Sequence, residues 1–259
     1  MKWGINMRNK KGKIITVTST KGGVGKTIFA LNLAGVYSNL GYKTLVIDLD
    51  LYGGAVSTYL NSTNDHTIYN LILDLNNNKY KRLEDYLYTY NENIDILSAP
   101  KDPRNAKKID PKYIPVVLNN ALYKYDVILI DTSHNLNDVN ILALDNSDYI
   151  LYIFTNDTFD LKNTKSFISI MKDVGYNNYY MILNNSILNK NYYSLYDIRN
   201  LLGTNIDFTI SKSMHIKNID KYLLEGQILI LNKNLLFTDK NESKKLNSIA
   251  LKLLDEEEK

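Results

Sequence analysis

The sequence predicts an α/β protein whose doubly wound, mostly parallel sheet carries helices on both faces. Strand-like apolar runs recur along the chain, and a helical or loop stretch follows each of them. Some runs, such as residues 127–130, are continuously apolar, as expected of strands that are buried on both sides. A glycine-rich segment also separates the first run from a helical pattern, which is typical of this fold class.

The expected strands are residues 14–18, 44–47, 94–97, 127–130, 149–154, 180–183 and 206–210. All four prolines fall between residues 100 and 115, which we predict to be an ordered loop because strand patterning resumes beyond it. Near the C-terminus, residues 243–254 place apolar side chains on one helical face: Leu246, Ile249, Ala250, Leu253 and Leu254. The acidic run that follows disfavours a membrane-surface helix, so we expect this helix to pack on the sheet.

The bulk composition favours one domain over residues 14–254, between a short tail (1–13) and an acidic tail (255–259). With 259 residues and 44% hydrophobic content, the chain can bury a sizeable core. The net charge of +3 demands neither nucleic acid nor an anionic membrane, and the lack of cysteine excludes disulfides and iron-sulfur clusters. No apolar stretch is long enough for a transmembrane segment or a signal core, so we expect a cytoplasmic protein.

Residues 21–27 read Lys-Gly-Gly-Val-Gly-Lys-Thr and lie directly between the first strand and the first helix. Glycines there let backbone N–H groups face phosphate oxygens, and the helix adds the positive end of its dipole. The spacing predicts that Lys26 reaches the phosphates and that Thr27 helps to hold Mg²⁺. The expected nucleotide-binding residues of this loop are Lys21, Gly22, Gly23, Val24, Gly25, Lys26, Thr27 and Ile28.

A strict Walker A motif has glycine where this chain has Thr20. The loop instead resembles the deviant Walker A of the ParA/MinD family of ATPases, which have a P-loop NTPase fold. The resemblance implies an ATP-sandwich homodimer with Mg²⁺, in which Lys21 contacts the nucleotide of the partner subunit and Lys26 that of its own. Many family members carry a second threonine where this chain has Ile28, so the resemblance does not extend to one hydroxyl contact with the α phosphate.

Aspartates follow two of the predicted strands at the edge where the phosphate loop lies. Asp48 and Asp50 come after residues 44–47, and Asp131 ends the run 127–130 in a Walker B pattern. The resemblance implies that Asp50 is the catalytic carboxylate, with Lys21 and Lys26 as its catalytic partners, and that Asp48 and Asp131 lie on the metal side with Thr27. Helix capping is the alternative role for Asp48 and Asp50.

Asn184 directly follows the expected strand 180–183 and resembles the family's asparagine that reads the adenine edge. The alternative is that Asn184 only forms a turn at the end of the strand. The three histidines, His66, His134 and His215, lie far apart without metal-ligand spacing, which favours surface or loop roles.

Within the family, residues 48–60 resemble the TadZ/CpaE pilus-assembly group, although no receiver-like domain precedes the first strand. The resemblance implies a slow ATPase that acts as a dimerisation switch, with a pilus or secretion protein as partner at a cell pole. The alternatives are a DNA-partitioning ATPase that binds nonspecific DNA and a scaffold with negligible hydrolysis. The best basic cluster for DNA binding is Lys101, Arg104, Lys107 and Lys108. Tyrosine autophosphorylation is disfavoured because no tyrosine cluster follows Tyr222.

Overall fold

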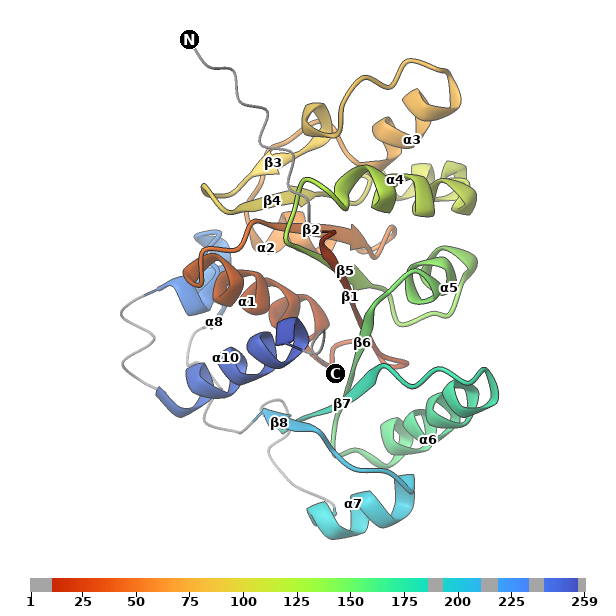
Figure 1. The fold of residues 1–259 in the computed structure, drawn as a ribbon, viewed down its shortest axis with the longest axis vertical. Coiled ribbons are helices and arrows are strands. Elements are labelled where there is room, and N and C mark those ends of the chain that lie inside the picture. The colour runs from red at the N-terminus through yellow and green to blue at the C-terminus, as the bar shows by residue number, and fades with distance from the viewer. Residues whose placement is uncertain (1–10, 186–192, 211–218, 233–239, 256–259) are drawn as a thin grey trace.

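The computed structural model describes residues 11–185, 193–210, 219–232 and 240–255 (Figure 1). Its centre is an eight-stranded sheet with the order β3-β4-β2-β5-β1-β6-β7-β8. Every neighbouring pair is parallel except β3 and β4, which are antiparallel. The strands are β1 (Lys13–Thr18), β2 (Thr44–Leu49), β3 (Tyr88–Thr89), β4 (Ile94–Leu97), β5 (Val127–Thr132), β6 (Tyr149–Phe154), β7 (Tyr179–Asn184) and β8 (Phe208–Ile210).

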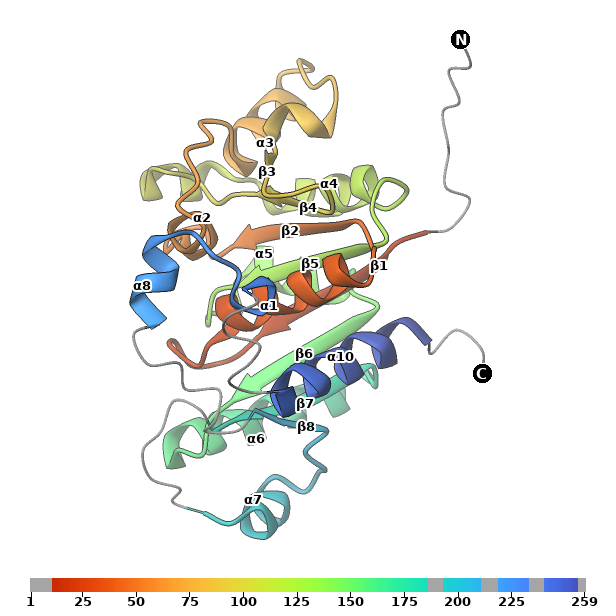
Figure 2. The ribbon, with the colours of Figure 1, turned by 90° about the vertical axis from the view of Figure 1, so that its left-hand side faces the viewer.

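Helices cover both faces of this sheet, as Figures 1 and 2 show. One face carries α1 (Lys26–Asn39) and α10 (Lys240–Asp255), with α8 (Ile219–Leu224) and α2 (Ala55–Tyr59) near the carboxyl ends of the strands. The other face carries α3 (Ile68–Asn76), α4 (Ile114–Ala121), α5 (Asp138–Asp145), α6 (Thr158–Asp173) and α7 (Leu195–Leu202). The doubly wound fold class is therefore confirmed.

The strands are buried on both sides because their apolar side chains alternate between the two helical layers. In β5, Val127 and Leu129 pack with α1 and α10, whereas Ile128 and Ile130 pack with α3, α4 and α5. A third cluster joins β6 and β7 to α6 and α7. The strands are continuously apolar because one side packs in the first cluster and the other side packs in the second or the third.

The C-terminal helix α10 packs as the sequence predicts. Its apolar face, formed by Leu246, Ile249, Ala250 and Leu253, is buried in the same core as α1 and β7. Tyr37 of α1 donates a hydrogen bond to the Ala250 carbonyl (3.2 Å). Within the described residues, no helix is both long and apolar enough to cross a membrane.

Three details differ from the sequence prediction. The two-residue strand β3 is not predicted, and β8 begins at Phe208, later than the expected start at residue 206. The proline-rich stretch is not a plain loop: it forms two 3₁₀ turns, η2 (Pro103–Lys108) and η3 (Pro111–Tyr113), and then α4, with prolines at the first helical positions. Two further 3₁₀ turns are η1 (Leu83–Tyr86) and η5 (Leu229–Leu231).

The strand order reverses at β1, because the chain passes from β1 outward to β2 and later from β5 across β1 to β6. In open α/β sheets such a switch point leaves a crevice outside the carboxyl ends of the strands, and ligands bind there. The loop between β1 and α1 lies at this position.

Candidate functional site

The loop between β1 and α1 has the backbone of an anion-binding loop. Gly23 and Gly25 have φ angles of 75° and 96°, which glycine adopts without the strain that a side chain would bring. Gly25 is also the N-cap residue of α1, where no side chain of the described residues caps the helix and no acidic residue lies in the first turn. The N–H groups at this helix start are therefore open to an anion.

Thr20 occupies the position where a strict Walker A motif has glycine. Among the described residues only Asn61 and Asn78 combine a side chain with a positive φ, so the Thr20 backbone does not require glycine. The Thr20 hydroxyl instead shares a hydrogen bond of 2.5 Å with the Tyr152 hydroxyl of β6. The departure from the strict motif is thus accommodated by a contact to the neighbouring strand.

Lys26 begins α1 and points into the loop. It is only 8% exposed, and its Nζ donates to Ser19 Oγ over 3.0 Å. Burial lowers the pKa of this ammonium group, while the nearby charges of Asp131 and Asp50 act in the opposite direction. Lys26 has no directly bonded carboxylate within the part of the chain that the structure describes, so this buried cation is suited to attract a phosphate group into the loop.

Thr27 and Asp131 meet across the site, since Thr27 Oγ1 donates to Asp131 Oδ2 over 2.5 Å. Asp131 is fully buried, and its other oxygen, Oδ1, has no hydrogen-bond partner among the described residues. Burial raises the pKa of Asp131 to about 7, against the lowering effects of Thr27 and Lys26. The nearby charge of Lys26 and the hydrogen bond from Thr27 therefore do not fully offset the cost of burying this carboxylate.

These oxygens fit Mg²⁺, a hard cation that prefers oxygen ligands and keeps several waters. No group of three or more metal-ligating His, Asp or Glu side chains occurs in the described part of the chain. The protein alone therefore forms no closed metal cage there. Mg²⁺ could instead bind to the Thr27 hydroxyl and to phosphate oxygens of a nucleotide. Waters bonded to Asp131 would complete its ligands.

Asp48 lies beside Asp131, because the two residues are partners in the register of β2 and β5. Its side chain is fully buried and accepts two backbone hydrogen bonds, from Asp50 (3.0 Å) and from Val56 (3.1 Å). Burial and the charge of Asp131 raise its pKa well above the usual range. Asp48 thus fixes the turn between β2 and α2, and its metal-side role stays a prediction.

Asp50 lies in that turn and is half-buried. Its Oδ1 accepts a hydrogen bond from the Gly53 N–H (3.2 Å), and its carbonyl accepts from Gly53 and Gly54. A Cβ atom at Gly53 would lie 2.5 Å from Asp50 Oδ2, so glycine is needed for this carboxylate position. We call residues 50–54 the Asp50 turn.

Lys21 projects from the same loop but forms an ion pair within its own chain. Its Nζ lies 3.2 Å from Asp157 Oδ1, and the two side chains are 38% and 27% exposed. Asp157 is the N-cap residue of α6 and accepts from the N–H groups of Phe159 and Asp160. Sequence reasoning did not find this partner, which lies 136 positions away in the chain.

Asn184 reaches the loop from the end of β7, and its Nδ2 donates to the Val24 carbonyl over 2.9 Å. Because Asn184 is buried and bonded to the loop backbone, it helps to hold the loop in place. Its neighbour Asn185 has a buried Oδ1 without a partner among the described residues. The adenine-reading role of Asn184 stays a prediction.

The structure also brings a histidine to the loop. His134, in the exposed segment after β5, lies against Gly22: a Cβ atom there would be 3.7 Å from His134 Nδ1. The spacing of the histidines along the chain does not indicate this contact. His66 has a different setting, with its Nδ1 3.0 Å from the Asp85 carbonyl, and His215 lies outside the described residues.

The predicted basic cluster is partly neutralised. Lys101 pairs with Asp65 over 2.5 Å, and Arg104 pairs with Asp102 over 2.7 Å. Lys108 bonds to Asn105 and lies over the ring of Tyr69. These partners reduce the net positive charge that the cluster can offer to phosphates.

Comparison with known proteins decides the family. The model of a family described as "AAA domain" matches residues 12–187, which include the loop, Asp48, Asp50 and Asp131. The chain belongs to this family. The match covers most of the sheet and all of the candidate site up to Asn184.

Curated relatives of this AAA domain protein include an ATPase of chromosome partitioning. It is 30% identical over 172 residues to an uncharacterised protein of Methanocaldococcus jannaschii (62% of this chain, 66% of that protein). It is 26% identical over 170 residues to the chromosome-partitioning ATPase Soj of Thermus thermophilus (65% of each). The tyrosine-protein kinase YwqD of Bacillus subtilis is 30% identical over 126 residues (48% and 51%). The chain spans between about half and two thirds of the length of the first curated relatives that it matches.

Solved structures show the same fold. A ParA family ATPase from Chlorobium tepidum superposes with a TM-score of 0.78 at 19% identity, over 92% of this chain and 98% of that one. The septum site-determining protein MinD from Pyrococcus horikoshii, solved as a complex with Mg-ADP, gives a TM-score of 0.76 at 24% identity, over 94% and 96%. At these identities the likeness establishes the ParA/MinD fold and leaves the activity to be argued from the site.

Proposed function

We propose that this AAA domain protein binds ATP with Mg²⁺ in the loop between β1 and α1 and hydrolyses it slowly. The observation that carries the proposal is the arrangement around Asp131: Thr27 bonds to one of its oxygens, and the other is buried without a partner among the described residues. The loop with Gly23, Gly25 and Lys26 lies directly beside it. A magnesium nucleotide would supply the charge and ligands that this site lacks.

Each group has a defined part in hydrolysis. The open N–H groups of the loop and the Lys26 ammonium would bind the β and γ phosphates. Mg²⁺, held through Thr27 and the waters on Asp131, would neutralise charge on the phosphate oxygens. The Asp50 carboxylate would orient the attacking water, whose oxygen bonds to the γ phosphorus as the bond to the bridging oxygen of ADP breaks. Gly53 holds that carboxylate in place.

Lys21 would act in a second copy of the chain, so that ATP joins two subunits and hydrolysis releases them. The two lysines of the loop lie in different environments. Lys26 is buried, whereas the side chain of Lys21 is 38% exposed. A surface lysine can exchange its own Asp157 for a phosphate of a partner subunit. Asn184 would read the adenine base.

For the output we propose control of a partner complex at the cell pole in the cytoplasm, of the Tad pilus-assembly type. The run of residues 48–60 supports this choice, since it forms the Asp50 turn and α2, the segment that nucleotide hydrolysis would move. We propose that residues 14–254 form one domain. The proposal includes no direct membrane contact, because the apolar face of α10 is buried.

A second candidate is DNA partitioning, which the similarity to Soj of Thermus thermophilus favours. The neutralised basic cluster speaks against it, since Lys101 and Arg104 already pair with carboxylates. A third candidate is a scaffold that binds ATP without turnover, in which Asp50 would not orient an attacking water. A fourth candidate is phosphotransfer to tyrosine, which the similarity to YwqD of Bacillus subtilis favours.

Nucleotide binding and phosphate release test these candidates together. Wild-type protein should bind a fluorescent ATP analogue in the presence of Mg²⁺ and release phosphate, whereas Asp50→Ala should bind it and release little. Equal turnover in the two proteins would remove Asp50 from its role. ATP-stimulated, salt-dependent binding to arbitrary duplex DNA would favour partitioning over pilus assembly.

A further inference from the structure

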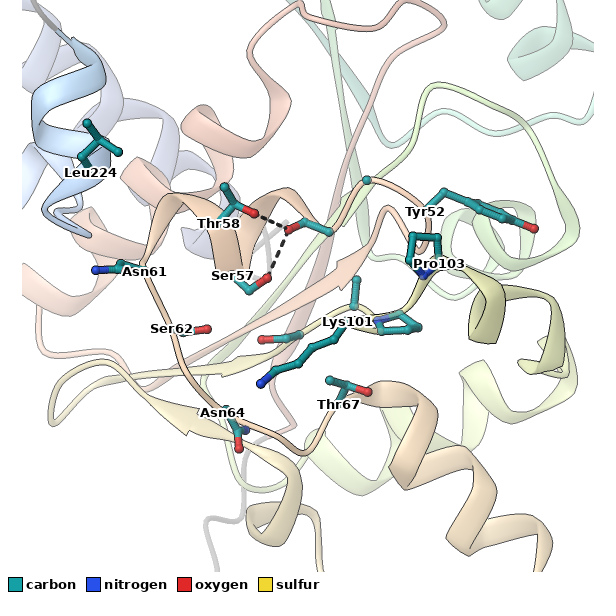
Figure 3. Close-up of a pocket in the computed structure, with 15 residues that line it drawn as sticks. Tyr52, Ser57, Thr58, Asn61, Ser62, Asn64, Thr67, Lys101, Pro103 and Leu224 are labelled. Atoms are coloured by element: carbon teal, nitrogen blue, oxygen red, sulfur yellow. Dashed lines mark hydrogen bonds between the residues drawn. The ribbon is translucent and has the colours of Figure 1, made fainter.

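A cavity of about 480 Å³ opens beside the Asp50 turn (Figure 3). Its walls are the Asp50 turn, α2 with the segment after it, and the chain that follows β4. Most of the lining side chains are hydroxyls and amides, among them Ser57, Thr58, Ser62, Asn61 and Asn64. Its volume is within the range of small-molecule sites, about 300–1,000 Å³.

One lining residue has an unmet hydrogen bond. Ser98, directly after β4, is only 2% exposed, and its hydroxyl has no partner among the described residues. Buried hydroxyls in folded proteins are almost always paired. A ligand with an acceptor atom at this wall of the cavity would supply the missing partner.

The charged and dipolar groups of the cavity favour an anion. Lys101 lies across it between Ser62 and Thr67, as Figure 3 shows. Its carboxylate partner, Asp65, is 87% exposed and does not line the cavity. Thr67 is the N-cap residue of α3, so the positive end of that helix also faces the cavity. No acidic side chain belongs to the lining among the described residues.

We propose that this cavity is a second ligand site, for a small anion that carries several hydroxyl groups, such as a phosphorylated sugar. The anionic group would share the Lys101 ammonium with Asp65 and accept from the Ser98 hydroxyl. The sugar hydroxyls would pair with Ser57, Ser62 and Asn64. Tyr52 and Leu224, at opposite ends of the cavity in Figure 3, leave it open to solvent.

Binding in the cavity would affect ATP hydrolysis because the two sites share the Asp50 turn. Gly53 and Gly54 line the cavity, and the same turn holds the carboxylate of Asp50. In α2, directly after the turn, the Val56 N–H donates to Asp48 Oδ2. An occupant that shifts these glycines would change the rate of ATP hydrolysis, a consequence that rests on the proposed function. Binding itself does not rest on it.

Thermal denaturation of the full chain with glucose 6-phosphate tests the binding. The titration is run without nucleotide and with ADP and Mg²⁺ at saturation, because the phosphate loop also attracts anions. Unphosphorylated glucose serves as the neutral probe. The variants are Ser98→Ala and Lys101→Ala, and the matched control is Lys107→Ala, an exposed lysine outside the lining. Ser98→Ala should fold well, since it removes a buried hydroxyl that has no partner in the described ranges of the chain.

Glucose 6-phosphate should raise the melting temperature with ADP present, and glucose should not. Its apparent affinity should fall about tenfold in Ser98→Ala and Lys101→Ala and stay unchanged in Lys107→Ala. No shift at millimolar glucose 6-phosphate, or a shift that both lining variants retain, overturns the proposal. ADP binding is read separately with a fluorescent analogue. Its failure would count against the proposed function alone, since the nucleotide-free titrations would still test the cavity.

Discussion

Lys21 Nζ lies 3.2 Å from Asp157 Oδ1, so the lysine that distinguishes this phosphate loop is held within its own chain. Both side chains are partly exposed, and an ion pair of this kind contributes at most about 1 kcal/mol. Such a weak pair can be exchanged for a phosphate of a second subunit. Breaking the pair therefore adds only a small free-energy cost to the contact between subunits that we propose.

Replacing Asp157 with asparagine should remove the free-energy cost of breaking the ion pair with Lys21. Asp157→Asn removes the charge but keeps an N-cap residue for α6, so the fold should be little affected. We expect the ATP-dependent dimer to form at a lower protein concentration than in the wild type, as measured by light scattering. Lys21→Ala should abolish it. An ATP-dependent dimer that both variants leave unchanged would refute the trans role of Lys21.

Much of the fold and the site follows from local sequence. The strands are continuous apolar runs, and the phosphate loop, Asp48, Asp50 and Asp131 lie at the ends of such runs. Parallel strands bring their carboxyl ends to one edge, so strand assignment alone places these residues together.

What could not be predicted depends on contacts between distant segments. Lys21 with Asp157, Asn184 with Val24 and His134 beside Gly22 join loops whose conformations no periodic pattern describes. The strand β3 has only two residues, too few for an alternating signal. Its place is set by pairing with β4 rather than by its own sequence.

Restoring the glycine of the strict motif should harm this protein. Thr20→Gly removes the hydrogen bond to Tyr152 and adds backbone freedom to the unfolded chain, at a cost of about 1–2 kcal/mol. We expect the melting temperature to fall by about 2–4 °C for each kcal/mol at this chain size. Affinity for ATP should not rise. A more stable variant with tighter ATP binding would contradict our explanation of Thr20.

The buried aspartates should make the nucleotide-free protein less stable as the pH rises. Burial raises the pKa of Asp131 from 3.8 to about 7, so the folded state holds a proton that the unfolded state releases. The stability from this group is present at low pH and is lost as the pH rises between these two values. Exposed carboxyls with a lowered pKa, such as Asp102, act in the opposite sense but are already ionised above pH 5.

Asp131→Asn tests this dependence, because an amide keeps the shape without the charge. Without nucleotide and Mg²⁺, the variant should be more stable than the wild type at pH 7.5 and should lose less stability between pH 5 and pH 7.5. Denaturant unfolding at several pH values measures both. Saturating Mg²⁺ and ATP should stabilise the wild type more than the variant. Parallel pH profiles for the two proteins would count against an uncompensated charge at Asp131.

A single methyl group at Gly53 should separate catalysis from nucleotide binding. The Cβ of Gly53→Ala would lie 2.5 Å from Asp50 Oδ2, so the carboxylate must leave the position in which the turn holds it. Loss of a positioned catalytic group costs about 10²–10⁴-fold, so turnover should fall at least tenfold if Asp50 orients the water. The phosphate-binding loop is untouched, so affinity for ATP should change little. Phosphate release and binding of a fluorescent ATP analogue measure the two effects, with Tyr52→Phe as the neighbouring control. Undiminished turnover in Gly53→Ala would show that hydrolysis does not depend on this placement of Asp50.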